Sequence, residues 1–273
     1  MTGDDQLFLE PAHDARVARF FSWWSRDKMV AKKFTTRLAL GSRGHLEALA
    51  EHDGPVIALA NHVCWWDPLV TLALQTTFWP DRRGYAPMDI DQLRKLKIFR
   101  TLGMFGVNPD DPRSLDAMSD FLAREFAQHA RPAFWITPQG RFEDVRTPIE
   151  VRPGAAKIAA DAVSAGLDVR CVAMALEYVF WLDPKPEILI RVEPVEPDRT
   201  NTPGWLRAMR GAMRTNGEAL AKLAMARDPG PFENLLGGDG AKINPLYDLW
   251  LRLRGKRADL VDRSRTPAES PPR

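Results

Sequence analysis

Short apolar runs alternate along the chain with segments of helical periodicity. Continuous apolar runs at residues 55–60, 133–137 and 169–176 have the length of strands that are buried on both faces. Shorter strand candidates lie at 85–88 and 104–107, and residues 187–195 alternate apolar and polar positions as an edge strand does. Because strands and helices interleave, the pattern predicts an α/β fold with a mixed, largely parallel sheet flanked by helices.

Helical periodicity fills the intervals between these strands. The predicted helices cover residues 15–40, 67–78, 92–102, 114–129, 154–165, 203–227 and 244–254. Asp67 is a good N-cap and Pro68 suits a first helical turn, so this pair marks the start of the second helix. Ser114 is a candidate cap for the fourth helix. The polar, Pro-rich residues 264–273 predict a disordered tail.

Length and composition place these elements in an ordinary globular protein. The 273 residues fit one large α/β domain at 41–230, preceded by an amphipathic helical segment at 1–40 and followed by a helix and tail at 231–273. A net charge of +2 predicts no nucleic-acid partner. The two cysteines, Cys64 and Cys171, are far apart, so they predict neither a disulfide framework nor a zinc site and favour a reducing compartment.

The N-terminal helical segment combines aromatic and basic residues. Phe20, Phe21, Trp23 and Trp24 lie among seven Lys and Arg residues between positions 16 and 37. An interfacial helix buries such rings in the headgroup zone and places such cations against anionic lipid. The alternative is a helix that packs its rings onto the domain and leaves its charges in solvent. The apolar region 56–79 is a poor membrane span because a polar cluster at 61–68 interrupts it, and the first residues carry no readable secretory signal.

One His and one Asp stand five positions apart at the turn after the first apolar run. On a continuous helix, His62 and Asp67 would point about 140° apart, so they meet only if the turn folds them together. A neutral His bonded to a carboxylate has a fixed tautomer, and its second nitrogen is a positioned base, typically worth about 10²–10⁴-fold in rate. The alternative is a structural His beside an N-cap Asp. Cys64 within the turn suits a small apolar filler better than a nucleophile.

Four segments in order resemble the lysophospholipid acyltransferase family, which includes glycerol-phosphate and lysophosphatidate acyltransferases. Residues 61–68 resemble the family's first signature, in which the His is the base and the Asp orients it. Residues 103–109, 137–142 and 172–175 resemble the second, third and fourth segments, and residues 152–157 match a basic-Gly-Ala helix start. The resemblance spans about residues 40–195 and makes the 41–230 region an expected acyltransferase domain.

The chain departs from the family pattern where the family binds phosphate. The Arg of the second segment is Pro109, with Arg113 nearby as a possible substitute. The Glu of the third segment is Gln139, the Arg has moved to position 141, and Phe142 follows it. Two acceptors therefore stay open. One is a lysophospholipid or acylglycerol phosphate that meets Arg113, Arg141 or Arg146, and the other is an uncharged polar lipid. Gly140 is expected to occupy a turn with positive φ beside the ligand, so residues 139–141 are counted with the substrate site.

The resemblance implies an O-acyltransferase of lipid metabolism and phospholipid biosynthesis. Acyl-CoA or acyl carrier protein would be the donor co-substrate, with no metal or other cofactor, at the cytoplasmic face of a membrane. Two rival interpretations use the same residues. A thioesterase would let the His–Asp pair activate water, although the chain lacks a G-x-S-x-G elbow. A non-catalytic lipid-binding relative would explain the departures at Pro109, Gln139 and Phe142.

Overall fold

The computed structural model describes residues 7–181 and 185–238. Its described strands form one nine-stranded sheet in the order β1-β5-β4-β6-β3-β7-β8-β2-β9. The strands are β1 Phe8–Leu9, β2 Thr35–Ala39, β3 Val56–Ala60, β4 Arg83–Asp89, β5 Met104–Val107, β6 Pro132–Ile136, β7 Arg170–Val179, β8 Glu187–Pro194 and β9 Phe232–Leu236. The five strands from β5 to β7 run parallel, and antiparallel pairing occurs at β1–β5, β7–β8 and β2–β9. The predicted mixed, largely parallel sheet is confirmed.

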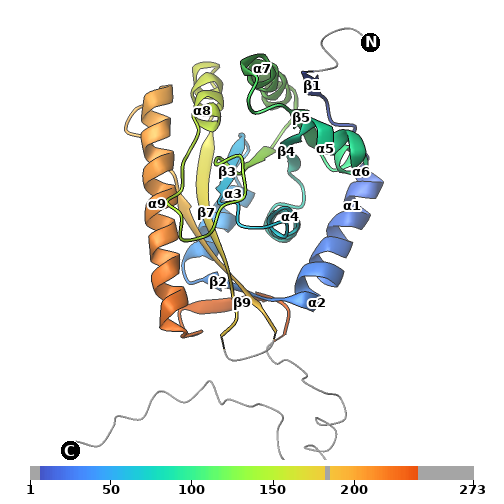
Figure 1. The fold of residues 1–273 in the computed structure, drawn as a ribbon. Helices are drawn as coiled ribbons and strands as arrows, with labels where there is room; N and C mark the ends of the chain where they lie inside the picture. Colours follow the sequence, from blue (N-terminus) through green and yellow to red (C-terminus); the bar gives the residue numbers. More distant parts are fainter. Residues whose placement is uncertain (1–6, 182–184, 239–273) are drawn as a thin grey trace, which may run out of the picture.

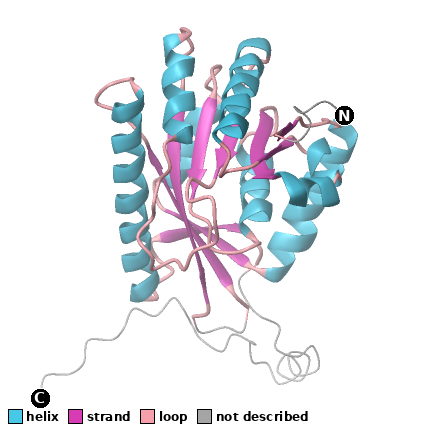
Figure 2. Cartoon of the chain, turned by 45° about the horizontal axis from the view of Figure 1, so that its top comes forward, coloured by secondary structure: helices cyan, strands magenta, loops and turns pink. Residues whose placement is uncertain are grey.

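Helices cover both faces of this sheet (Figures 1 and 2). They are α1 Ala15–Trp23, the π-helix η2 Trp24–Val30, α2 Ala31–Lys33, α3 Ser42–Ala50, α4 Asp67–Phe78, α5 Ile90–Lys95, α6 Ile98–Thr101, α7 Pro112–Gln128, α8 Gly154–Ser164 and α9 Thr202–Ala226. Alternate residues of β3 enter opposite cores: Ile57 and Leu59 pack with α7, α8 and α9, while Val56 and Ala58 pack with α3 and α4. Burial on both faces explains the continuous apolar run of β3.

The predicted helix at 15–40 is wrong in its last part, because residues 35–39 form strand β2. The strand is buried throughout and pairs with β8 on one side and β9 on the other. Thr35 and Thr36 favour extended backbone, and the buried guanidinium of Arg37 is bonded to Glu187 of β8. Residues 187–195 were therefore wrongly predicted as an edge strand, since β8 lies between β7 and β2.

Two predicted helix starts also differ from the structure. Asp67 is the first residue of α4 and does not cap it, because its carboxylate turns back to accept hydrogen bonds from the preceding loop. Helix α7 is capped by Asp111, whose side chain accepts a hydrogen bond from the Arg113 amide. Ser114 instead accepts a hydrogen bond from the Asn108 amide and donates one to the Leu7 carbonyl. Asp67 is thus bonded within the preceding turn, whereas the cap of α7 lies three residues before the predicted Ser114.

Three further predictions have separate outcomes. The helix expected at 92–102 is two short helices, α5 and α6, because Leu96 leaves helical geometry at φ −108° and ψ 56°. The hydrophobic pattern predicted no strand at the positions of β1 and β9. The helix expected at 244–254 and the disordered tail lie outside the described residues, and the division into segments 1–40, 41–230 and 231–273 stays a prediction.

Candidate active site

The turn between β3 and α4 brings His62 and Asp67 together. The Nδ1 atom of His62 lies 2.9 Å from Oδ2 of Asp67, which confirms the predicted contact. The Asp67 side chain is 1% exposed and the His62 side chain is 18% exposed, so the carboxylate lies beneath an imidazole that reaches the surface. Since the carboxylate accepts at Nδ1, the neutral ring carries its proton there and leaves the Nε2 lone pair available. Among the described residues, no protein group bonds Nε2.

The Asp67 carboxylate also organises the turn around it. Oδ2 accepts hydrogen bonds from the amides of Val63 at 2.6 Å and Cys64 at 3.0 Å. Oδ1 accepts one from the Tyr178 hydroxyl at 2.7 Å, and the Cys64 thiol lies 3.7 Å from the same atom. A buried carboxylate is costly unless such donors surround it. The same oxygens therefore fold the turn and orient the imidazole.

Burial and the nearby carboxylate keep the neighbouring acids protonated. Burial, followed by the charge of Asp67, raises the pKa of the Tyr178 hydroxyl above its ordinary value. Burial likewise raises the pKa of the Cys64 thiol. A thiolate is the nucleophilic form of cysteine, so this environment disfavours Cys64 as a nucleophile. Cys64 is partly exposed and its thiol contacts the Asp67 carboxylate, so its surroundings are more polar than those expected of a small apolar filler.

Asn61 ties the start of the turn to the adjacent strand β7. Its Nδ2 donates to the Leu176 carbonyl at 2.9 Å, and its Oδ1 accepts from the Leu176 amide at 2.7 Å. Main-chain pairing between β3 and β7 ends at Ala60 and Met174, so the buried Asn61 side chain extends the ladder by one further pair of bonds. This link holds His62 at the carboxyl edge of the sheet, where open α/β sheets bind ligands.

Gln139 reaches the same turn from the loop after β6, the neighbour of β3 on its other side. Its Oε1 accepts a hydrogen bond from the His62 amide at 2.8 Å, and its Nε2 donates to Glu143 at 2.6 Å. The Glu143 amide in turn donates to the His62 carbonyl at 2.9 Å. Gln139 was expected to contact substrate, but its buried amide is engaged inside the protein. Gly140 has the predicted positive φ, 72°.

Apolar rings flank the imidazole. The Phe142 ring centroid lies 4.1 Å from that of His62, and Phe142 is 58% exposed. Trp65, which is 60% exposed, stacks on Trp66 at 5.0 Å between centroids. Trp66 in turn contacts Phe34, which contacts Tyr178. The base therefore stands beside an exposed apolar surface and not in a purely polar cleft.

The three arginines expected to bind an anionic acceptor are each paired with a nearby carboxylate. Arg113 binds Asp111, Arg141 binds Glu143 and Arg146 binds Asp144, all with a closest N···O separation of 2.7–2.8 Å. Arg152 differs from them. A Cβ placed on Gly140 would lie 3.4 Å from the Arg152 guanidinium, and no described carboxylate lies within salt-bridge distance of that group.

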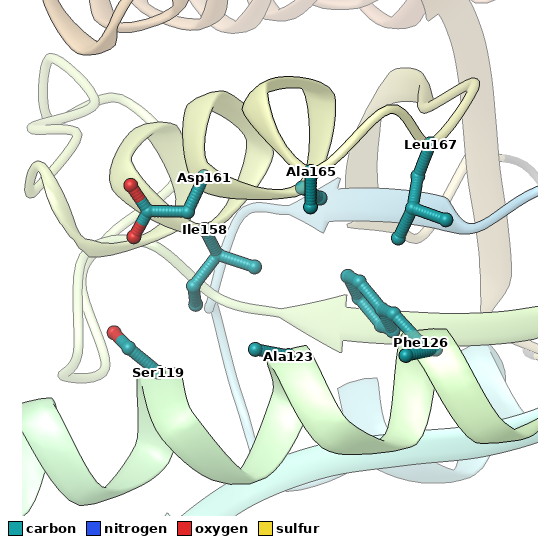
Figure 3. A pocket seen from close by; sticks show the side chains of 9 residues that line it. Ser119, Ala123, Phe126, Ile158, Asp161, Ala165 and Leu167 are labelled. Carbon is teal, nitrogen blue, oxygen red and sulfur yellow. The ribbon is translucent and has the colours of Figure 1, made fainter.

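Two cavities lie away from His62 and Asp67, which line neither. The first is a groove between α7 and α8 of about 100 Å³, lined by small and apolar side chains with Ser119 and Asp161 at one end (Figure 3). That volume is below the usual range for ligand sites. The second, of about 330 Å³, lies where β7 and α9 end and includes Glu177, whose pKa burial raises. Within the described residues, no group of three or more His, Cys, Asp or Glu side chains is placed to hold a metal ion.

Tyr178, Glu143 and Phe142 contact the site but were not recognised as site residues from sequence. Tyr178 is 111 residues from Asp67, so no local spacing could have pointed to it. Glu143 follows Gln139 by four positions within a loop, and this spacing carries meaning only on a helix. Phe142 was noted only as a departure from the family pattern.

An imidazole oriented by a buried carboxylate at the carboxyl edge of an α/β sheet is an arrangement that hydrolases and group-transfer enzymes use. Residues 43–177 match the family model described as Acyltransferase. This region of the chain therefore matches the acyltransferase family, as the resemblance of its motifs implied. That range contains the whole His62–Asp67 turn and the Gln139 loop.

Among solved structures, the chain is similar to the 1-acyl-sn-glycerophosphate (LPA) acyltransferase PlsC from Thermotoga maritima. The two share 16% sequence identity, with a TM-score of 0.43, over 77% of this chain and 78% of that chain. No curated protein sequence matched the chain.

Proposed function

We propose that the protein transfers a fatty acyl group from an acyl thioester to the hydroxyl of a lysophospholipid or another polar lipid. The observation that carries the proposal is the 2.9 Å bond between His62 Nδ1 and Asp67 Oδ2, with Nε2 left without a described protein partner. His62 is the general base, and Asp67 fixes its tautomer. Gln139 and Tyr178 are positioning residues that act through these two.

The reaction follows from this arrangement. Nε2 takes the proton of the acceptor hydroxyl as its oxygen attacks the thioester carbonyl carbon. The tetrahedral intermediate then collapses, the carbon–sulfur bond breaks, and the new ester forms. The protonated imidazole, which Asp67 stabilises, returns the proton to the departing thiolate. The donor is proposed to be acyl-CoA or acyl carrier protein, and the chemistry of the site is the same for both.

A lysophospholipid is the better-supported acceptor because Arg152 offers a cation beside the Gln139–Gly140 turn. Arg113, Arg141 and Arg146 are each already paired with a nearby carboxylate. A guanidinium suits a phosphate headgroup because it donates two parallel hydrogen bonds. The neighbouring apolar surface of Phe142 and Trp65 suits the acyl chain of either substrate.

The deciding experiment supplies radiolabelled acyl-CoA, or the acyl carrier protein donor, with and without lysophosphatidate. We expect a labelled lipid product that requires the acceptor. His62→Ala should abolish it, and Asp67→Asn should lower kcat by roughly 10²–10⁴-fold. Circular dichroism would establish that both variants remain folded.

Other results of that assay would point elsewhere. Thioester loss that is independent of acceptor would favour the hydrolase interpretation. Lipid binding without thioester loss would favour the non-catalytic one. Full turnover by folded His62→Ala protein would remove the mechanism.

We further propose that the protein works at the surface of an anionic membrane, on its cytoplasmic face. Helix α1 supports this, because Phe20 is 62% exposed and Trp23 is 43% exposed beside Arg16, Arg19 and Lys28. No described helix is both long and apolar enough to cross a bilayer. Flotation with anionic vesicles tests the proposal, and a Phe20→Ser/Trp23→Ser variant should float less.

A further inference from the structure

A second exposed apolar and basic segment lies at the junction of α5 and α6. All of residues 94–98 are exposed, with Leu96 at 44% and Ile98 at 45%. Lys95 and Lys97 alternate with these two aliphatic side chains, and Arg94 is bonded to Asp91. The segment therefore combines exposed apolar and basic side chains at one place on the surface.

The backbone holds this segment in place. The Leu96 amide donates to the Gln92 carbonyl at 2.9 Å, and the Phe99 amide donates to the Leu96 carbonyl at 3.0 Å. Leu93, one turn earlier, is fully buried and anchors α5 to the domain. Leu96 and Ile98 are therefore presented outward by an ordered turn.

The segment is attached to the start of α1. The Ala12 amide donates to the Arg100 carbonyl at 2.9 Å, and the Asp14 amide donates to the Thr101 carbonyl at 3.1 Å. The Phe99 and Phe21 rings meet with centroids 6.0 Å apart. Figures 1 and 2 show α6 beside the first turns of α1. Ile98 precedes Phe99 in the sequence, and Phe20 precedes Phe21. The two exposed side chains are therefore next to the ring contact that joins α6 to α1.

Charge identifies the partner that this surface fits. Lys95 and Lys97 add cations to those of Arg16 and Arg19 on α1 and of Lys28 on η2. A surface with aliphatic and aromatic side chains projecting between cations fits the headgroup zone of an anionic bilayer, where the apolar groups enter and the cations meet phosphate. Binding strength grows with the apolar area that is buried and with the attraction to anionic lipid, so a second such segment would strengthen attachment through α1.

We propose that the α5–α6 turn is a second membrane-contact element, and that Leu96 and Ile98 insert into an anionic lipid surface beside α1. This inference rests on the proposal that the protein works at a membrane. The proposed insertion site lies about 75 residues after α1 in the sequence. A deletion of the N-terminal helix would therefore leave it in the protein. It is independent of the chemistry at His62.

The test is flotation of the full chain with vesicles of equal parts phosphatidylglycerol and phosphatidylcholine, and with phosphatidylcholine alone. Leu96→Ser/Ile98→Ser should weaken partition to the mixed vesicles by roughly tenfold or more, the value of losing one or two inserted aliphatic side chains. Lys95→Gln/Lys97→Gln should weaken binding to mixed vesicles at low salt and change binding to phosphatidylcholine little.

A control is available after β7 and at the end of α9. Phe180 and Met225 are 69% and 74% exposed, more than Leu96 and Ile98, so Phe180→Ser/Met225→Ser removes at least as much exposed apolar surface at another place. This control should float as the wild type does. Equal losses of vesicle binding in the control and in Leu96→Ser/Ile98→Ser would overturn the proposal, because they would reflect nonspecific hydrophobic adsorption.

Other outcomes separate this inference from the function. Wild-type binding by Leu96→Ser/Ile98→Ser, with loss in Phe20→Ser/Trp23→Ser, would overturn the α5–α6 element and leave α1 as the contact. No flotation of the wild type would remove the membrane proposal altogether. A loss of self-association without a loss of vesicle binding would show that the turn meets a second copy of the chain. Acyl transfer to a short-chain, water-soluble acceptor should be unchanged in the Leu96→Ser/Ile98→Ser protein. If the wild type does not catalyse this transfer, the proposed acyltransferase reaction is refuted and the membrane contact is not.

Discussion

The Tyr178 hydroxyl donates a 2.7 Å hydrogen bond to Oδ1 of Asp67, across 111 residues of sequence. The other carboxylate oxygen is the one that faces His62. The phenol thus occupies the acceptor atom that the imidazole does not use, and it fixes the plane of the carboxylate. Tyr178 comes from β7, so the strand that neighbours β3 supports the orientation of the base.

Tyr178→Phe should lower kcat without raising KM. The substitution keeps the ring and removes one hydrogen bond to a charged group, which is worth about 1.5–3 kcal/mol. Because the lost bond orients Asp67, we expect a several-fold fall in kcat with a modest fall in Tm. Steady-state kinetics with varied acceptor separates kcat from KM. A purely structural role would lower Tm and leave the kcat of the folded fraction unchanged.

Gln139→Glu should destabilise the protein even though Glu is the residue that the family pattern has there. The new carboxylate would face Glu143, which now accepts the Gln139 amide at 2.6 Å. In the wild type this bond, and then the pairing with Arg141, lowers the pKa of Glu143. The variant loses the bond but keeps the Arg141 pairing, so the new carboxylate meets a charged one at neutral pH. Two like charges in contact cost stability.

The exchange Gln139→Glu/Glu143→Gln should recover part of that loss, because it restores one amide and one carboxylate at the contact. Thermal unfolding of the wild type, both single variants and the double variant gives the coupling free energy. Strictly additive changes in the free energy of unfolding would contradict the contact as the source of the effect.

Arg152→Gln should raise KM for a lysophospholipid acceptor and leave KM for an uncharged acceptor such as a monoacylglycerol unchanged. The reason is the loss of a cation that no described carboxylate neutralises. An increase of roughly tenfold corresponds to one charge-assisted hydrogen bond. Arg146→Gln is the matched control, since Arg146 is exposed and already bound to Asp144. Equal KM changes in the two variants would contradict a specific role for Arg152.

Stability should fall between pH 6.5 and about pH 4 because of His13. Burial and then the charge of Arg83 lower the pKa of His13 to about 4 from 6.5, against an opposing effect of Glu125 and a further lowering by His129. Its buried Nε2 has no hydrogen-bond partner among the described residues, and its ring meets Tyr85 edge-on. Below pH 6.5 His13 binds a proton in the unfolded chain, whereas in the folded chain it stays neutral until the pH nears 4. The stabilisation is therefore complete above pH 6.5 and is lost as the pH falls towards 4.

The measurement compares Tm against pH for the wild type and His13→Gln. The variant should lose less stability than the wild type between pH 7 and pH 5. His45→Gln, at a histidine whose side chain is 40% exposed, should keep the wild-type slope. Identical slopes for the wild type and His13→Gln would contradict the role of His13.

The His62–Asp67 turn could be predicted from the sequence because all of its parts are local. The apolar run 56–60, the polar residues after it and Pro68 in the first turn of α4 lie within thirteen consecutive positions. Strand burial and helix initiation act over such distances, so they leave a readable pattern. The positive φ of Gly140 was readable for the same reason.

Strand β2 and the partners of the base were decided by the tertiary structure. Residues 35–39 continue a helical apolar pattern, yet pairing with β8 and β9 and the buried Arg37–Glu187 contact make them a strand. Gln139 and Tyr178 reach the site only because β6 and β7 flank β3 in the sheet. Strand order is set by long-range packing and leaves no periodicity in the chain. The sequence alone therefore determined that His62 and Asp67 meet, while the order of the strands determined what holds them in position.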